Sequence, residues 1–210
     1  MFQRLNNILV IFFLLFVHNR GYIMFRAYVD GSYIENGASR FGACIEEYVR
    51  GRVLGRKWYS IEISKSVSID NVQSVECFAI WFALRKFYEK FRYEGIDSSS
   101  VERITIYSDA LTVIGRLNSE SFKNGMDMET RKIVFRFVNN EIKSLGVVYS
   151  GELLFEWKKR SDAMISRVDK VAGGKYSRVP VSEDLYKGSV TSFSKDGNHI
   201  VYGMGLFMER

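Results

Sequence analysis

The fold of this chain is indicated most clearly by one short stretch, Phe25-Arg26-Ala27-Tyr28-Val29-Asp30-Gly31-Ser32. Its first five residues form a β-prone run, and the polar Asp30-Gly31-Ser32 that follows is typical of a strand end. Two more strand candidates, 40–48 and 57–64, come next and are separated by glycine-containing turns. Three strands joined by short turns predict an antiparallel meander that begins with the strand carrying Asp30.

The rest of the chain alternates between helices and strands. Apolar residues at helical spacing predict two long helices, over 72–90 and 129–144. Between them, the β-branched run 103–107 is expected to pair in parallel with the first strand through a right-handed crossover. Shorter predicted segments are a helix at 111–117, a polar loop at 118–127, a strand at 153–157 and a helix at 161–172. The order predicts an α/β fold, a five-stranded mixed sheet with three antiparallel strands and then parallel strands, flanked by helices.

Both ends of the chain differ from this core. Residues 1–23 contain an apolar run, 8–17, that is shorter than the about 20 residues of a bilayer-spanning helix. The stretch 17–21 lacks the small-residue pattern of a secretory cleavage site. We therefore interpret 1–23 as an apolar extension, or as sequence preceding a true start at Met24. Residues 175–210 are predicted to be a C-terminal extension that forms a β-hairpin around an Asp-Gly turn.

Composition restricts the function only loosely. A formal net charge of +6 and a pI of about 9.2 are compatible with a polyanionic partner such as nucleic acid. The two cysteines, Cys44 and Cys77, lie in apolar runs without a CxxC or Cys/His cluster. A zinc site is therefore not expected. We expect instead that both cysteines are buried, reduced thiols of a cytoplasmic protein.

Four acidic residues fall at informative places in this order of elements. Asp30 and Asp109 each end a strand, and the two strands are predicted to be parallel neighbours, so the carboxylates would lie side by side. Glu76 and Asp169 lie in predicted helices among apolar residues, where a charge is expensive to bury without a partner. Converging carboxylates need cations, and oxygen ligands suit Mg²⁺ or Mn²⁺.

Each acid also has an ordinary structural interpretation. Asp30 could be a turn residue before glycine, and Asp109 could cap the helix that follows it. Glu76 and Asp169 could be exposed charges on their helices. The four acids are persuasive as an ordered set rather than singly.

With these motifs, the sequence resembles the type 1 ribonuclease H family over residues 24–174. Four fragments carry the resemblance: Asp30-Gly31-Ser32, Gln73-Ser74-Val75-Glu76-Cys77-Phe78-Ala79, Ser108-Asp109, and Arg167-Val168-Asp169-Lys170-Val171-Ala172. The resemblance implies a ribonuclease H-like domain over 24–174. It also implies an endonuclease that hydrolyses the RNA strand of RNA–DNA hybrids with two metal ions, Mg²⁺ or Mn²⁺.

The resemblance also implies roles for individual residues. Asp30, Glu76, Asp109 and Asp169 would bind the metal ions. Gln73 matches an Asn or Gln of the family that contacts the minor groove, and Gly31 and Ser32 would lie against the substrate. Lys159 and Arg160 belong to the densest basic cluster near the site, which is either a phosphate contact or a solvated loop.

The chain departs from the family in one loop. Many relatives carry a catalytic histidine between the fifth strand and the last helix, whereas residues 158–166 here contain none. The histidines of this chain, His18 and His199, lie outside the matched region. This difference predicts a slower enzyme, or one in which Lys159 or Arg160 helps to release product.

Three alternatives remain from the sequence. The chain could be a non-catalytic ribonuclease H-like module that binds nucleic acid or protein, or an integrase- or resolvase-type nuclease of the same superfamily. The apolar run at 8–17 also leaves open a periplasmic or membrane-anchored protein. We expect a cytoplasmic monomer with RNA–DNA hybrid as its partner and no membrane association.

Overall fold

The computed structural model describes residues 23–35, 37–65, 67, 69, 71–123, 133–180, 182–193 and 200–207. The apolar run at 8–17 and the predicted hairpin turn lie outside the described residues. Within them, no helix combines the length and the apolar character needed to cross a membrane.

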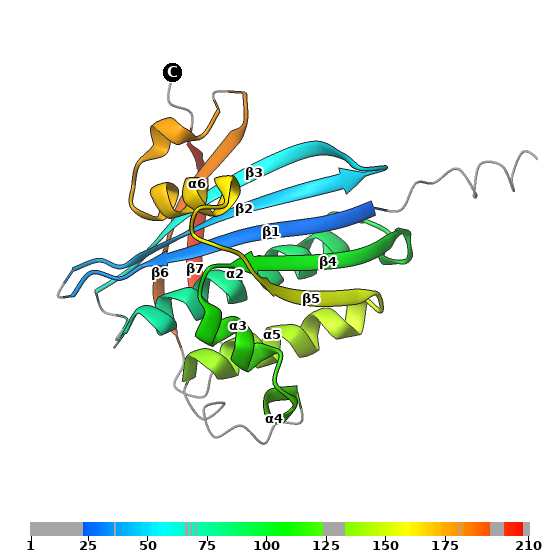
Figure 1. Cartoon of the computed structure of the whole chain (residues 1–210), viewed down its shortest axis with the longest axis horizontal. Coiled ribbons are helices and arrows are strands. Elements are labelled where there is room, and N and C mark those ends of the chain that lie inside the picture. Colours follow the sequence, from blue (N-terminus) through cyan, green and yellow to red (C-terminus); the bar gives the residue numbers. More distant parts are fainter. Residues whose placement is uncertain are drawn as a thin grey trace, which may run out of the picture.

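A mixed sheet forms the centre of the fold (Figure 1). Its strands lie in the order β5-β4-β1-β2-β3-β6-β7. They are β1 (Ile23–Ser32), β2 (Arg40–Val49), β3 (Arg52–Ile63), β4 (Val101–Ser108), β5 (Glu152–Trp157), β6 (Asp184–Phe193) and β7 (Ile200–Phe207). The predicted meander β1-β2-β3 is antiparallel, and β4 pairs in parallel with both β1 and β5.

Helices cover both faces of the sheet (Figure 1). The helices α2, α3 and α5 lie on one side and α6 lies on the other. The helices are α2 (Val72–Arg92), α3 (Leu111–Leu117), α4 (Glu120–Lys123), α5 (Ile133–Val148) and α6 (Ala163–Ala172), with short 3-10 turns at Ser98–Ser100 and Tyr176–Arg178. The large apolar cluster lies between the sheet and α2 with α5, and a smaller cluster lies beneath α6.

Strand alternation explains this two-sided core. In β1, Phe25, Ala27 and Val29 are fully buried and belong to the large cluster. Tyr28, the alternate residue, belongs to the cluster beneath α6. Successive side chains of a strand point to opposite faces, so one strand supplies both layers.

Two predictions about the sheet and its loops were incomplete. The sheet of the described residues has seven strands, not five, because β6 pairs in parallel with β3 and β7 extends the sheet further. The predicted hairpin is therefore part of the central sheet. The polar loop predicted at 118–127 contains the short helix α4 in its described part. The proposed division of the chain at residue 174 stays a prediction.

Candidate metal centre

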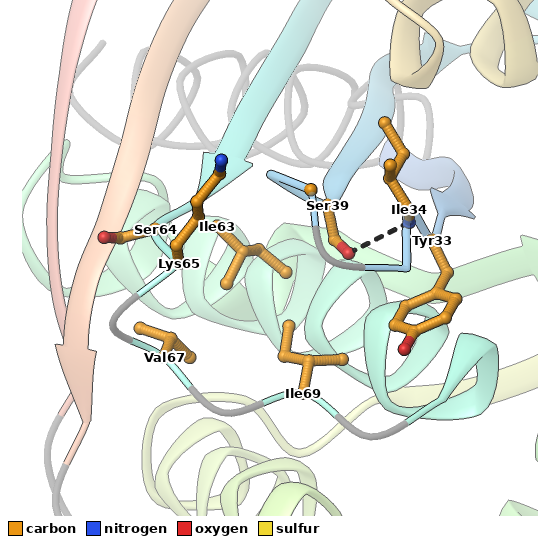
Figure 2. Close-up of a pocket in the computed structure, with 9 residues that line it drawn as sticks. Tyr33, Ile34, Ser39, Ile63, Ser64, Lys65, Val67 and Ile69 are labelled. Atoms are coloured by element: carbon orange, nitrogen blue, oxygen red, sulfur yellow. Dashed lines mark hydrogen bonds between the residues drawn. The ribbon is translucent and has the colours of Figure 1, made fainter.

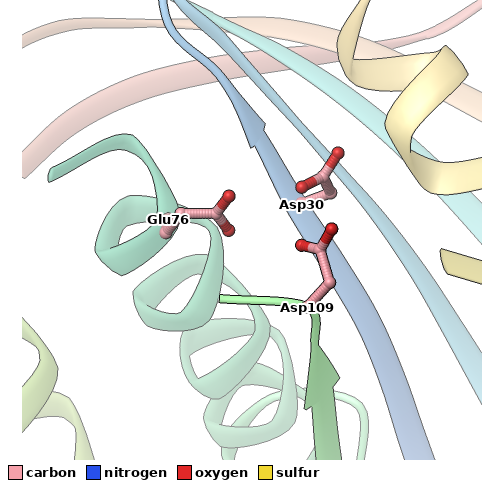
Figure 3. A group of neighbouring side chains, drawn as sticks. All are labelled: Asp30, Glu76 and Asp109. Atoms are coloured by element: carbon pink, nitrogen blue, oxygen red, sulfur yellow. The ribbon is translucent and has the colours of Figure 1, made fainter. Parts of the chain in front are cut away.

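Three of the four predicted acids converge at one edge of the sheet. Asp30 lies near the end of β1, Asp109 directly follows β4, and Glu76 projects from the second turn of α2. One carboxylate oxygen from each lies within 4.8 Å of the others. Figure 3 shows the three carboxylates pointing toward one another. The cluster forms because β1 and β4 are parallel neighbours whose carboxyl ends meet at the same edge.

A close approach of α2 to β1 brings Glu76 into the cluster. A Cβ atom on Gly31 would lie 2.9 Å from the backbone nitrogen of Glu76 and 3.0 Å from a methyl group of Val75. Only glycine allows this contact between strand and helix. Asn71 caps the helix by accepting a hydrogen bond from the Ser74 backbone N–H at 2.9 Å. The close approach of α2 gives Gly31 a packing role in addition to the predicted substrate contact.

Asp30 is the most unusual residue of the cluster. It is 1% exposed, and in the ionised state no donor among the described residues reaches either of its carboxylate oxygens. A hydrogen bond to Glu76 forms only when one of the two carboxyls carries a proton. Burial, followed by the charges of Glu76, Asp109 and Asp169, raises the pKa of Asp30 well above its ordinary value.

Glu76 is better supported by its neighbours. It is 5% exposed, so it is not the exposed helix charge of the alternative interpretation. Ser108 donates a hydrogen bond to its Oε2 at 3.4 Å, and the backbone N–H of Gly31 donates to it as well. Burial and the charge of Asp109 nevertheless raise the pKa of Glu76. Asp30 and Glu76, the two most buried acids of the cluster, therefore repel each other unless a proton or a cation lies between them.

Asp109 does not cap α3, contrary to the other alternative. The N-cap residue of that helix is Ala110, and no side chain makes a capping hydrogen bond there. The Asp109 carboxylate instead faces the cluster, while its backbone carbonyl accepts from the Leu111 backbone N–H. Its side chain is 14% exposed, which makes it the open side of the three-acid cluster.

Asp169 lies outside the three-acid cluster but is linked to it by Arg160. The Arg160 Nη2 atom is 3.1 Å from Asp169 Oδ1, and its Nε atom is 3.4 Å from Asp109 Oδ2. The side chain of Asp169 is 41% exposed and that of Arg160 is 70% exposed. The structure therefore brings together three of the four predicted ligands, Asp30, Glu76 and Asp109. The guanidinium of Arg160 lies between Asp109 and the fourth, Asp169.

The proposed substrate-contacting residues surround the cluster at different depths. Gln73 is exposed in the first turn of α2, and Ser32 is partly buried at the end of β1. Lys159 is exposed. Lys158, from the same basic cluster, pairs with Asp162 at 3.3 Å and lies over the Tyr107 ring. Of this basic cluster, Arg160 contacts the acids.

Two contributors to the site were missed by the sequence analysis. Ser108 was quoted only as a neighbour of Asp109, yet its hydroxyl supports Glu76. Trp157 donates from its indole nitrogen to the Asp109 carbonyl at 3.1 Å. The Ser108-Asp109 motif was a signal that could have identified Ser108 as a residue of the site. The contact of Trp157 with Asp109 depends on the pairing of β4 with β5, which no local sequence pattern reveals.

A separate pocket lies at the ends of β1 and β3, beside the segment that leads into α2 (Figure 2). Tyr33, Ser39, Lys65 and Ile69 contribute to its wall. Ser39 accepts a hydrogen bond from the backbone of Ile34 at 3.3 Å. The pocket contains none of the four acids, so it is a feature distinct from the candidate metal centre.

The donor set of the cluster fits a hard divalent cation. It offers carboxylate oxygens alone, which Mg²⁺ and Mn²⁺ prefer over softer metals. The two unpaired, buried oxygens of Asp30 are the strongest sign, since a buried charge without a partner is otherwise strongly unfavourable. Asp30, Glu76 and Asp109 are the residues that would hold the cation.

Comparison with known proteins gives no match to a protein-family model or to a curated protein. Among solved structures, RNase H1 from the halophilic archaeon Halobacterium salinarum NRC-1 aligns at 16% identity and a TM-score of 0.48, over 74% of this chain and 99% of that chain. The PFV RNase H domain aligns at 13% identity and a TM-score of 0.44, over 78% and 99%. A foamy viral protease-reverse transcriptase in complex with RNA/DNA hybrid aligns at 15% identity and a TM-score of 0.46, over 76% and 20%.

The chain's own topology defines its fold class. An antiparallel β1-β2-β3 meander is followed by β4 and β5, which are added in parallel beside β1, and helices cover both faces. This is the ribonuclease H-like arrangement that the sequence predicts, extended here by β6 and β7. The predicted resemblance is therefore confirmed at the level of the fold.

Proposed function

We propose that this chain is a ribonuclease H-like nuclease that hydrolyses the RNA strand of RNA–DNA hybrids at the Asp30–Glu76–Asp109 cluster. One observation carries the proposal: Asp30 is buried against two other carboxylates, with no donor among the described residues for either of its oxygens. A protein that used these acids only for stability would gain by replacing Asp30 with a neutral residue. Binding a divalent cation gives the cluster a use.

Bound divalent cations would supply charge neutralisation at the phosphodiester and activation of the attacking water. The chain's own residues fix where this chemistry occurs. Asp30 and Glu76 hold their carboxylates rigidly because β1 and α2 are in close contact at Gly31. Asp109, on the open side, is the acid that a phosphate of the substrate approaches first.

Discrimination of RNA from DNA is assigned to the N-terminal end of α2. The 2′-hydroxyl distinguishes the two strands, and in A-like duplexes it is displayed in the wide minor groove. Gln73 is exposed there, three residues before Glu76. Its amide can both donate to and accept from groups in the groove. We infer that Gln73, with Gly31 and Ser32 beside it, faces the minor groove.

Asp169 and Arg160 form the adjustable side of the site. Asp169 is proposed as the ligand of a second cation. Arg160 bridges Asp109 and Asp169 by forming an ion pair with each. Because Arg160 is mostly exposed, its side chain can leave the acids and contact a phosphate instead. We propose this exchange as the step in which Arg160 assists product release, in place of the histidine that the loop lacks.

The same ion pairs favour one alternative, a non-catalytic hybrid-binding module. A guanidinium at Asp109 and Asp169 partly neutralises the site without any cation. In that case the protein would bind RNA–DNA hybrid equally well with and without divalent metal, and it would cut none.

The decisive experiment offers the purified protein labelled RNA–DNA hybrid, duplex DNA and duplex RNA, each with Mg²⁺, Mn²⁺ or EDTA. We expect cleavage of the RNA strand of the hybrid alone, dependent on metal. Asp30→Asn should reduce cleavage by at least 10³-fold, on the order of the loss for an essential group. The matched control is Glu102→Gln, an exposed acid at the opposite end of β4, which should cut like the wild type. Binding without cleavage under every condition would favour the module.

A further inference from the structure

Trp157 differs from the other tryptophans of the chain. The protein has three, and Trp58 and Trp81 are buried at 0% and 4% exposure. Trp157, the last residue of β5, is 44% exposed. β5 is the edge strand of the sheet, so no further strand of the described residues lies beyond it (Figure 1).

The ring of Trp157 is fixed beside the candidate metal centre. Its indole Nε1–H donates to the backbone carbonyl of Asp109 at 3.1 Å, and the backbone N–H of Leu111 donates to the same oxygen at 2.9 Å. The single polar group of the indole is thus used inside the protein, which leaves the exposed part of the side chain apolar. Leu111, joined to the same carbonyl, is 62% exposed.

Trp157 and Leu111 are thus two exposed apolar residues whose N–H groups bind the same backbone carbonyl, that of Asp109, the most exposed acid of the three-acid cluster. Aromatic side chains of nucleic-acid-binding proteins hold single strands by stacking on the faces of the bases. In a duplex the bases are stacked on one another, so the sugars of the minor groove are what such a ring can reach.

We propose that Trp157, with Leu111 beside it, packs against a ribose of the RNA strand next to the scissile phosphate, and that its hydrogen bond positions Asp109. This inference rests on the proposed hybrid-cleaving function. The ring supplies substrate affinity, and the indole N–H supplies the orientation of an acid in the site. The two roles predict different consequences for two substitutions.

Substitution separates the two roles. Trp157→Phe keeps an aromatic ring but loses the donor, so kcat should fall about 10-fold while the Kd for hybrid changes less than about 3-fold. Trp157→Ala loses both, so the Kd should also rise by about 5-fold, the lower end of the range for lost base–aromatic stacking, because a ribose offers the ring a smaller contact than a base. Tyr93→Ala removes an exposed aromatic at the far end of α2 and is the control that should match the wild type.

Intrinsic fluorescence gives a readout that does not depend on activity. Because Trp58 and Trp81 are buried, acrylamide quenches mainly the emission of Trp157. Saturating hybrid, added in Ca²⁺ with a gel check that the RNA stays intact, should lower the quenching constant at least about twofold. In Trp157→Phe the remaining emission should be poorly quenched and unaffected by hybrid. Melting curves of each variant verify that it is folded.

The outcomes separate this inference from the function on which it rests. Anisotropy of a labelled hybrid measures binding independently of tryptophan. If hybrid binds but acrylamide quenching is unchanged, and both variants bind and cut like the wild type, the role of Trp157 is refuted and the nuclease proposal stands. If labelled hybrid is neither bound nor cut by the wild type, both proposals fail.

Discussion

At the scale of single residues, Asp30 is the acid of the site whose ionisation is least favourable. It is buried, it lacks a donor among the described residues, and it faces the carboxylates of Glu76 and Asp109. Removing a carboxylate from water and placing it near like charges both oppose ionisation. Asp30 therefore weakens the metal-free protein and is useful only when a cation is bound.

This conflict predicts how stability depends on pH. The pKa of Asp30 rises from its ordinary 3.8 to about 9, by burial first and then by the charges of Glu76 and Asp109. The unfolded chain gives up this proton near pH 4 and the folded, metal-free chain holds it to about pH 9. The free energy of unfolding should therefore decrease as the pH rises through this range.

Asp30→Asn should remove most of that dependence. At pH 8 in EDTA we expect the variant to melt about 2–8 °C above the wild type, on the order of 1–2 kcal/mol for a chain of this size. Added Mg²⁺ should raise the melting temperature of the wild type and leave that of the variant unchanged. Calorimetric melting across pH 4 to 9 tests this. A variant that is less stable than the wild type at pH 8 would contradict it.

Arg160 leads to a second prediction at this scale. If its ion pairs to Asp109 and Asp169 assist product release, Arg160→Ala should lower steady-state kcat by about 10-fold or more while a single turnover stays within about 3-fold of the wild type. Arg92→Ala, which removes an exposed guanidinium at the C-terminal end of α2, is the matched control and should change both rates little. Equal losses in single and multiple turnovers would place Arg160 in the chemical step instead.

At the scale of elements, two glycines set the distances between strands and helices. Gly31 allows α2 to approach β1, and Gly42 allows α6 to approach β2. A Cβ on Gly42 would lie 2.7 Å from the carbonyl oxygen of Val168 and 3.0 Å from the nitrogen of Ala172. Because Asp169 directly follows Val168, this contact also fixes the position of the proposed fourth ligand.

Gly42→Ala should therefore destabilise the fold by about 1–3 kcal/mol, the usual penalty for overpacking a rigid contact. Gly55→Ala in β3 is the control, since a Cβ there meets nothing within 4 Å, and it should change stability by less than about 0.5 kcal/mol. Urea denaturation measures both. Equal effects of the two substitutions would mean that α6 docks more loosely than the contact implies.

Local sequence patterns predicted most elements well. The helix predicted at 72–90 extends to Arg92, and that at 111–117 matches α3. The helix predicted at 129–144 is described from 133 to 148, where apolar spacing continues past the predicted end. β1 and β3 are longer than predicted, because pairing with β2 holds residues at their ends extended, polar and apolar alike.

The acid cluster was predictable for a different reason. Asp30 and Asp109 each follow an evident strand, and the parallel pairing of those strands follows from the helix between them. The supporting contacts were less accessible. Ser108 with Glu76 and Arg160 with Asp169 join residues that lie 32 and 9 positions apart, at distances set by packing alone.

At the scale of the whole molecule, the C-terminal hairpin belongs to the central sheet. Tyr202 of β7 packs edge-on against Trp81 of α2, and its hydroxyl donates to Glu89. Before β6, Glu183 accepts from the indole of Trp58 at 2.5 Å and pairs with Arg56 at 3.4 Å. The sequence indicated a hairpin but not its partner, because parallel pairing of β6 with β3 joins segments far apart in the chain.

A chain ending at residue 180 should consequently lose stability rather than merely lose an appendage. It would expose the edge of β3 and the apolar groups that Val190 and Tyr202 cover. We expect aggregation, or a melting temperature at least about 10 °C lower, consistent with a loss of several kcal/mol. Tyr202→Ala should produce a smaller decrease of about 1–2 kcal/mol, because Tyr202 is only partly buried where it packs against α2. A truncated chain as stable as the full one would make the hairpin a separate module.

Titration of the metal-free protein with Mn²⁺, followed by calorimetry, shows whether the Asp30–Glu76–Asp109 cluster is a divalent-cation site. We expect saturable binding with release of protons near pH 7, since the cation replaces protons held by the carboxyls. Asp30→Asn should abolish this binding, and Glu102→Gln should preserve it. Absence of binding in the wild type, or equal binding in Asp30→Asn, would mean that the cluster is not a divalent-cation site.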